Sequence, residues 1–376
     1  MKLKSRRLPC LLAVVTSALI HSASVGASDI DECDNLAAHP DDPERKNAGL
    51  PFEKIPLPEA LSACKKAMEQ GPENSRLIYQ YGRTLLASGK QAEGIALILS
   101  SAAKGYPQAV YTLGLVEHRK TPANLSGAAE KYRRAAELGH TKAMLLLGAM
   151  YLEGKGAPPD AGQALSYFRR AAEMGDAEAQ TEVGVIYLGG FGVLQNYSEA
   201  ARWFATASER DPFASYVLGL MYMNGEGVIQ DIARAFQLFR RAVEKGSDEA
   251  MGVLGTCYLY GWGVAEDRSE ALRWLRKAAE KNDREGMRYL GNALVGPERS
   301  AEEVSEGLSL LTNAAEVGDP IAADNLASIY YYGHGVPVDK RKAAYWQDEA
   351  EQIRSVYREK PRPLKIPPHR AVLPLG

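Results

Sequence analysis

Glycine recurs at a nearly constant interval along most of this chain, and this periodicity constrains the fold more than any other feature. When the repeating segments are aligned, these glycines form a column. Its successive members lie 34 to 36 residues apart in the sequence, and Ala327 takes the place of the next glycine. A second column, which includes Gly139 and Gly175, keeps the same interval. Two columns with one period indicate a repeat protein, in which each unit packs mainly on its neighbours. The first column consists of Gly114, Gly148, Gly184, Gly219, Gly255 and Gly291.

Each unit is expected to contain two helices. In the first helix, the column glycine has a small residue five positions before it and an aliphatic residue directly before it. A tyrosine follows the glycine, and these positions share one helical face. Glycine costs about 1 kcal/mol relative to alanine inside a helix, so its recurrence indicates that a neighbouring helix approaches closely there. The second helix carries a bulky residue followed by a small pair, as Phe168 precedes Ala171 and Ala172.

The connection between the two helices is also repeated. Two glycines and a valine follow the tyrosine at fixed offsets, as in Gly225, Gly227 and Val228. The first glycine is typical of a left-handed helix terminus. The sixth unit departs from this pattern, with Leu294 in place of the tyrosine and Pro297 in the loop. We expect a longer or mobile connection in that unit.

The tyrosine, the paired-glycine loop, the valine and the alanine pair recur in register over roughly residues 108–352. This combination resembles the Sel1-like repeat family, which is related to the tetratricopeptide repeats. The resemblance implies an all-α fold, a right-handed α-solenoid of about seven helical hairpins. It also implies a scaffold that binds a partner protein along its concave face, as adaptors of the bacterial envelope do.

The first 27 residues have the pattern of a secretory signal peptide. A basic start precedes an apolar run from Leu8 to Ile20 that is too short to span a bilayer, and Val25 and Ala27 suit a cleavage site. We therefore expect a periplasmic or secreted protein, cleaved near Ala27. No later segment is apolar enough to cross a membrane.

Charge and cysteine content narrow the partner class and the compartment. Without the four basic residues of the signal peptide, 41 basic residues stand against 47 acidic ones, which argues against nucleic acid as a partner. An exported chain meets an oxidising environment, so Cys33 and Cys64, which flank the N-terminal segment, are the expected disulfide. Cys257 lies in a repeat helix without an obvious partner and is expected to be a small buried residue.

We expect five regions along the chain. The signal peptide (1–27) precedes a disulfide-tied N-terminal cap segment (28–74), which is expected to be extended at first and helical over residues 60–70. A degenerate tetratricopeptide-like hairpin (75–107) and the repeat array (108–352) follow, since end repeats need a covered outer face. The Pro-rich basic tail (353–376) cannot continue a helix. It is expected to be extended or disordered, or alternatively to be a docking peptide in the polyproline conformation.

The sequence predicts no catalytic residues, no metal site and no cofactor. No two histidines have the spacing of metal ligands, and no glycine-rich loop has the context that phosphate binding requires. One alternative is a β-lactamase-like hydrolase, as in cysteine-rich members of the family. Those members carry a cysteine pair in each repeat, which this chain lacks.

Variable positions on the first helix of each unit supply the expected partner contacts, because they line the concave face of such a solenoid. They grade from apolar in the middle of the array to polar near its end, and tyrosine and arginine are favoured anchors. The alternatives are ordinary solvent-facing residues, a glycan-binding module for peptidoglycan or exopolysaccharide, or an oligomer formed through an array end, so the oligomeric state stays open. The candidate contacts are Tyr216, Arg288, Tyr289, Asn292, Asn325, Tyr331 and Tyr332.

Overall fold

The structure, a computed structural model, describes residues 29–120 and 122–359. These residues form helices and no strand, which confirms the predicted all-α fold. They divide into two compact units: residues 29–40 with Arg45–Leu97, and Asp41–Glu44 with the chain from Ile98 onward. The predicted signal peptide and the segment from residue 360 lie outside the described residues. The last helix runs to Glu359, past residue 352 where the array was expected to end.

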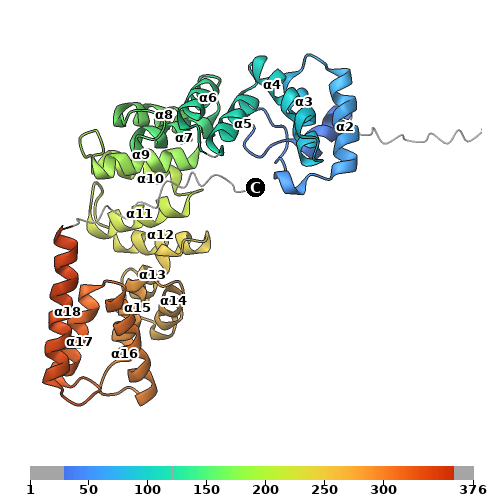
Figure 1. Cartoon of the computed structure of the whole chain (residues 1–376). Coiled ribbons are helices and arrows are strands. Elements are labelled where there is room, and N and C mark those ends of the chain that lie inside the picture. Colours follow the sequence, from blue (N-terminus) through green and yellow to red (C-terminus); the bar gives the residue numbers. More distant parts are fainter. Residues whose placement is uncertain (1–28, 121, 360–376) are drawn as a thin grey trace, which may run out of the picture. The chain divides into compact units, whose positions relative to one another are not determined.

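The second unit contains seven consecutive helical hairpins (Figure 1). The first unit contains α1 (Asp29–Ala37), η1 (Phe52–Lys54), α2 (Leu57–Gln70), α3 (Ser75–Ala87) and most of α4 (Gln91–Ala103). The hairpins pair α5 (Pro107–His118) with α6 (Leu125–Glu137), α7 (Thr141–Glu153) with α8 (Ala161–Glu173), α9 (Ala177–Gly189) with α10 (Tyr197–Ala207), α11 (Pro212–Asn224) with α12 (Ile232–Glu244), α13 (Glu249–Tyr260) with α14 (Arg268–Glu280), α15 (Arg284–Leu294) with α16 (Ala301–Glu316), and α17 (Pro320–Tyr332) with α18 (Lys340–Glu359).

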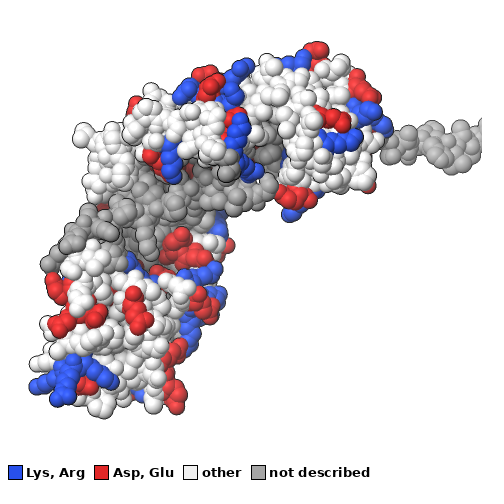
Figure 2. Space-filling view, viewed as in Figure 1, with Lys and Arg blue, Asp and Glu red and all other residues white. Residues whose placement is uncertain are grey.

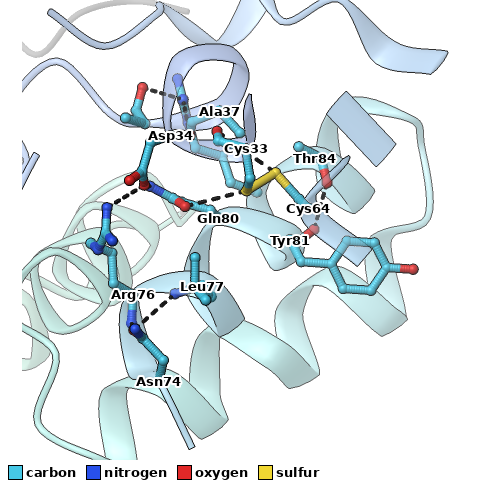
Figure 3. The surroundings of a disulfide bond; sticks show 12 residues. Cys33, Asp34, Ala37, Cys64, Asn74, Arg76, Leu77, Gln80, Tyr81 and Thr84 are labelled. Atoms are coloured by element: carbon cyan, nitrogen blue, oxygen red, sulfur yellow. Dashed lines mark hydrogen bonds and ion pairs between the residues drawn. A yellow bond between two sulfur atoms is a disulfide. The ribbon is translucent and has the colours of Figure 1, made fainter. Parts of the chain in front are cut away.

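A disulfide and a buried ion pair hold the first unit together (Figure 3). Cys33 on α1 is bonded to Cys64 on α2, with a distance of 4.7 Å between their Cα atoms. Beside it, the fully buried carboxylate of Asp34 pairs with Arg76 and accepts a hydrogen bond of 2.9 Å from Gln80 Nε2, both on α3. These contacts tie α1 to two other helices and pair, through Asp34 Oδ1, a charge that would be costly if it were buried alone.

The segment around Cys33 is helical, and its expected extended conformation was wrong. Asp29, Asp31 and Glu32 occupy the first turn of α1, where carboxylates favour the positive end of the helix dipole. Burial of Cys33 and Ala37, one helical turn apart, places one face of this short helix against the rest of the unit. The prolines that follow had suggested an extended chain, but they begin only after α1 ends.

The column glycines face a bulky side chain of the second helix in the same hairpin. A Cβ atom on Gly219 would lie 2.6 Å from the ring of Phe239, and one on Gly148 would lie 2.7 Å from the ring of Phe168. The absent side chain is therefore the space that the ring fills, and this accounts for the helix propensity lost at each position. The same contact pairs Gly114 with Tyr132, Gly184 with Phe204, Gly255 with Leu275 and Gly291 with Leu311.

The paired loop glycines have different roles. Gly225 ends α11 with a φ of 74°, in the left-handed region, as predicted. Gly227 has a φ of 69°, and a Cβ atom there would lie 2.3 Å from the backbone carbon of Tyr197, at the start of the preceding hairpin's second helix. The first glycine thus ends the helix, and the second allows the loop to contact the preceding hairpin.

Two connections depart from the pattern. In the sixth hairpin α15 ends in extended backbone at Val295, and α16 begins with a capping box between Ser300 and Glu303. The connection spans residues 295–300 and is one residue shorter than the 225–231 connection, so the expected longer loop was wrong. After α10, the backbone N–H groups of Arg210 and Asp211 both donate to the carbonyl of Ala207, which closes the turn without a glycine.

Side chains on the first helices form hydrogen bonds with the residue that caps the next first helix. His140 precedes α7, and its Nε2 lies 2.8 Å from Gln108 Oε1 on α5. In α9, Thr181 Oγ1 donates to Asp211 Oδ2 over 2.7 Å, and Asp211 caps α11. These contacts join the first helices of consecutive hairpins, and so they fix the register between successive repeats.

The glycine contact predicts the effect of a single methyl group. Gly219→Ala gains about 1 kcal/mol of helix propensity but overpacks Phe239, which costs about 1–3 kcal/mol. We expect a net loss of about 1 kcal/mol, measured as a lower midpoint of urea unfolding by circular dichroism. Gly162→Ala is the control, because a Cβ atom there meets only the Asp160 carboxylate, at 3.3 Å. An equal midpoint for both variants would contradict the packing role of Gly219.

His140 predicts a pH dependence of stability. The side chain is fully buried, and burial lowers its pKa to about 3 from an ordinary value of 6.5. Because the folded pKa is depressed, the unfolded chain binds the proton more readily, and stability falls as the pH drops below 6.5. The comparison variant is His140→Asn, because asparagine caps helices well and does not titrate. Between about pH 6 and pH 4, the free energy of unfolding of the wild type should fall more steeply than that of the variant, by up to about 1.4 kcal/mol per pH unit. Equal slopes for the two proteins, measured by urea unfolding at several pH values, would show that His140 does not titrate in this way.

Candidate functional site

The predicted concave row on the first helices is more buried than a solvent-facing row would be. Tyr111, Leu145, Thr181 and Arg288 are each at most 9% exposed. First helices contact one another in series from α11 to α17, and Thr181 and Arg288 form hydrogen bonds with Asp211 and Asp319, the residues that cap the next first helix. Part of the expected partner surface is therefore an interface between repeats.

Arg288 is the clearest example among the candidate contacts. Its Nε donates to Asp319 Oδ2 over 3.0 Å, and Asp319 caps α17. Burial lowers the pKa of the guanidinium, but Asp319 and Tyr289 together outweigh burial and raise the pKa above its ordinary value. The guanidinium carbon also lies 4.2 Å from the ring centroid of Tyr289, so this side chain contacts its own array on two sides.

The remaining candidates lie in separate places. Asn325 Nδ2 donates to Asn292 Oδ1 over 3.1 Å, which joins α17 to α15. Tyr331 and Tyr332 lie at the end of α17, 53% and 66% exposed, with their ring centroids 4.9 Å apart. Tyr216 lies on α11, and its ring centroid is 6.2 Å from that of Phe239. The seven residues thus do not form a single cluster.

An apolar groove of about 360 Å³ lies between α9 and α11, in the middle of the array. We call it the α9–α11 groove. Its lining includes Val185, Leu188, Phe191, Tyr197, Phe213, Tyr216, Val217, Leu220 and Met221, with Gln195, Asn224 and Glu226 as polar members. Of the candidates from the sequence, it contains only Tyr216. The expectation of an apolar middle agrees with this lining.

Sequence reasoning missed three aromatic residues of the groove, and only Phe213 lies on a first helix, α11. Phe191 stands between the two loop glycines after α9, and Tyr197 begins α10. Both remain more than one third exposed, at 38% and 39%. An aromatic residue between two loop glycines is a signal visible in the sequence, but its position beside α11 depends on how successive hairpins stack.

The surroundings of the groove are acidic. Burial is the main reason that the pKa of Tyr216 rises to about 12, and the carboxylates of Glu285, Asp283 and Glu249 raise it further. All three lie at or beside the start of α13 or α15. Carboxylates therefore lie close to an apolar surface in the middle of the array.

Elsewhere, charges of both signs alternate on the face shown in Figure 2. Several form ion pairs between successive hairpins, such as Arg241 with Glu209 at 2.5 Å and Arg276 with Glu306 at 3.4 Å. Exposed pairs of this kind contribute little stability individually. Their positions indicate a solvated outer surface.

Cys257 is fully buried, and burial raises the pKa of its thiol to about 12, so it is protonated at neutral pH and a poor nucleophile. Among residues 29–120 and 122–359, no His, Cys, Asp and Glu side chains are grouped so that they could hold a metal ion. No helix in this part of the chain is long and apolar enough to cross a membrane.

Comparison with solved structures identifies similar proteins. One is c5321 of Escherichia coli, a protective antigen present in uropathogenic strains that displays an SLR fold. It is 25% identical, with a TM-score of 0.61, over 81% of this chain and 76% of c5321. Another is a Sel1 repeat protein from Oxalobacter formigenes, 26% identical with a TM-score of 0.56, over 80% of this chain and 92% of the other. No curated protein gives a significant match to the sequence.

The model of the Sel1 repeat matches six segments: residues 110–140, 141–176, 177–212, 212–247, 248–283 and 320–346. Residues 284–319, between the last two matches, contain the hairpin with the irregular connection. Sel1 repeat proteins are generally protein-interaction scaffolds, and the fold is typically non-catalytic. The matched segments cover more than half of the sequence, and the chain belongs to the Sel1 repeat family.

Proposed function

We propose that this protein is an exported scaffold of the bacterial envelope that binds a protein partner along its first helices, with the α9–α11 groove as the main anchor site. The observation that carries the proposal is an apolar groove lined by four aromatic side chains, in a chain that belongs to a family of interaction scaffolds. Aromatic residues in apolar pockets supply much of the binding energy at protein interfaces.

Two features support export. Residues 1–27 have the composition of a signal peptide, and the Cys33–Cys64 disulfide is typical of proteins that fold outside the cytoplasm. The pair closes a loop with a sequence separation of 31 residues. In the chain-entropy model such a crosslink stabilises by about 3–4 kcal/mol, which a small N-terminal unit would lose in a reducing compartment.

The form of the groove favours a macromolecular partner. Phe191 and Tyr197 at its side are partly exposed, whereas Phe213 at the start of α11 is 7% exposed. This arrangement gives a buried floor and an accessible aromatic rim. A peptide segment of a partner with one or two apolar side chains fits such a surface, and the rim excludes water from the contact.

The exposed pair Tyr331 and Tyr332 is a second contact region in this proposal. Tyr332 also stacks on His334, with 5.7 Å between ring centroids. Aromatic rings held by neighbouring rings lose little conformational entropy on binding. The same exposed rings are the feature that favours a glycan ligand as the alternative.

A crosslinking experiment tests the groove. A photo-crosslinking amino acid in place of Phe191 should give one prominent protein adduct in the native envelope, identified by mass spectrometry. The same amino acid at Ile229 is the control, since Ile229 is 91% exposed and does not line the groove. The same adducts at both positions, or none at position 191, would contradict the proposal.

The tyrosine pair is tested by substitution. Tyr331→Ala with Tyr332→Ala should weaken partner binding at least about thirtyfold, because aromatic anchors contribute more than about 1 kcal/mol each at interfaces. Tyr345→Ala on α18, where the side chain is 56% exposed, is the matched control and should bind normally. If partner binding is unchanged but retention on peptidoglycan is lost, the glycan alternative replaces the protein partner at this site.

A further inference from the structure

The α9–α11 groove has a charge and an aromatic lining that match one segment of the same chain. Residues 360–376 contain Lys360, Arg362, Lys365 and Arg370 and no acidic residue. Near the groove, the acidic side chains are Glu226 in its lining, and Glu249, Asp283 and Glu285, whose carboxylates raise the pKa of Tyr216. An acidic surface beside an apolar groove attracts a basic segment that also carries apolar side chains.

The composition of this segment suits an aromatic groove. Five prolines favour the polyproline II conformation, which loses little entropy on binding because it is already extended. Polyproline segments bind in grooves lined by aromatic side chains. Between the prolines, Leu364 and Ile366 supply apolar side chains on either side of Lys365. The groove has four aromatic residues available for them.

The last helix carries the chain toward the acidic side of the array. Arg354 on α18 pairs with Asp324 on α17, one turn after α17 begins at Pro320. Because the two helices of a hairpin are antiparallel, α18 ends beside the start of α17. Asp283 and Glu285 lie at the start of α15, the first helix that precedes α17 in the array and contacts it.

The available length is sufficient. The groove lies three first helices back from α17, and helices packed side by side are about 8–10 Å apart, which gives a path of about 30 Å. The segment 360–376 has 17 residues. At about 3.1 Å per residue in the polyproline conformation it spans about 53 Å, which leaves several residues to lie in the groove.

We propose that residues 360–376 bind in the α9–α11 groove of their own chain as a polyproline strap that a partner must displace. This inference rests on the proposed function of the groove and adds its regulation. The strap lowers the apparent affinity of the array for its partner, because only the fraction of molecules with an open groove is competent to bind.

Limited proteolysis of the purified full chain tests the strap directly. Trypsin cleaves after Lys365 and Arg370, whereas Lys360 and Arg362 precede proline and resist cleavage. The variant Phe191→Ala with Tyr197→Ala removes two partly exposed rings of the groove. We expect cleavage at both sites, measured by mass spectrometry, to be about tenfold faster than in the wild type, because cleavage follows the population of the undocked segment. Ile229→Ala is the matched control and should be cleaved at the wild-type rate.

A second variant and two conditions complete the test. Glu226→Lys keeps the apolar lining but reverses a charge, and it should accelerate cleavage, as should high salt in the wild type. Circular dichroism confirms that each variant is folded. Equal cleavage rates in wild type and both groove variants would overturn the strap.

The concentration dependence identifies the occupant. A strap within one chain protects equally at low and high protein concentration, whereas protection that grows with concentration would assign the groove to the segment of a second copy and overturn the proposal as stated. No partner is present in this assay. If the proteolysis assay contradicts the strap, the crosslinking result at position 191 still stands. If residues 360–376 are protected but no partner adduct forms, the strap is supported and only the proposed function is contradicted.

Discussion

The contact between a glycine on the first helix and a ring or leucine on the second sets the thickness of each hairpin in this protein. With Phe239 seated over Gly219, the two helices approach more closely than any side chain at position 219 would allow. Six hairpins repeat this arrangement, so their exposed surfaces match and can stack in series. The recurring tyrosine, loop glycines and alanine pairs can pack in the same way in each hairpin only if the hairpins are equally thick.

Stacking then depends on contacts between one hairpin and the next. Capping residues such as Asp211 and Asp319 accept hydrogen bonds from the preceding first helix, so a residue that ends one connection also aligns two repeats. This use of polar side chains explains why a row expected to face a partner is partly buried. Accessible aromatic side chains remain in the α9–α11 groove and at the end of α17, and binding is proposed at those two places.

The sequence predicted the fold well because periodic packing leaves a periodic pattern. The glycine column, the left-handed helix ends and the Cys33–Cys64 pairing could all be inferred from spacing and composition. The helix α1 was missed because its stability comes from Asp34 and its partners on α3, which are distant in sequence. The groove was only partly foreseen, since Phe191 and Tyr197 reach it from a loop and a second helix, and no helical periodicity relates them to Tyr216.

The second loop glycine has a further consequence. Gly227 abuts main-chain atoms of Tyr197 and Ser198, and Gly263 abuts the main chain of Ile232 in the same way. A joint made through the backbone does not depend on which side chains its neighbour carries. Hairpins of this kind are interchangeable building blocks, and a lineage can duplicate, shuffle or diversify them, changing what the array recognises while its joints stay the same.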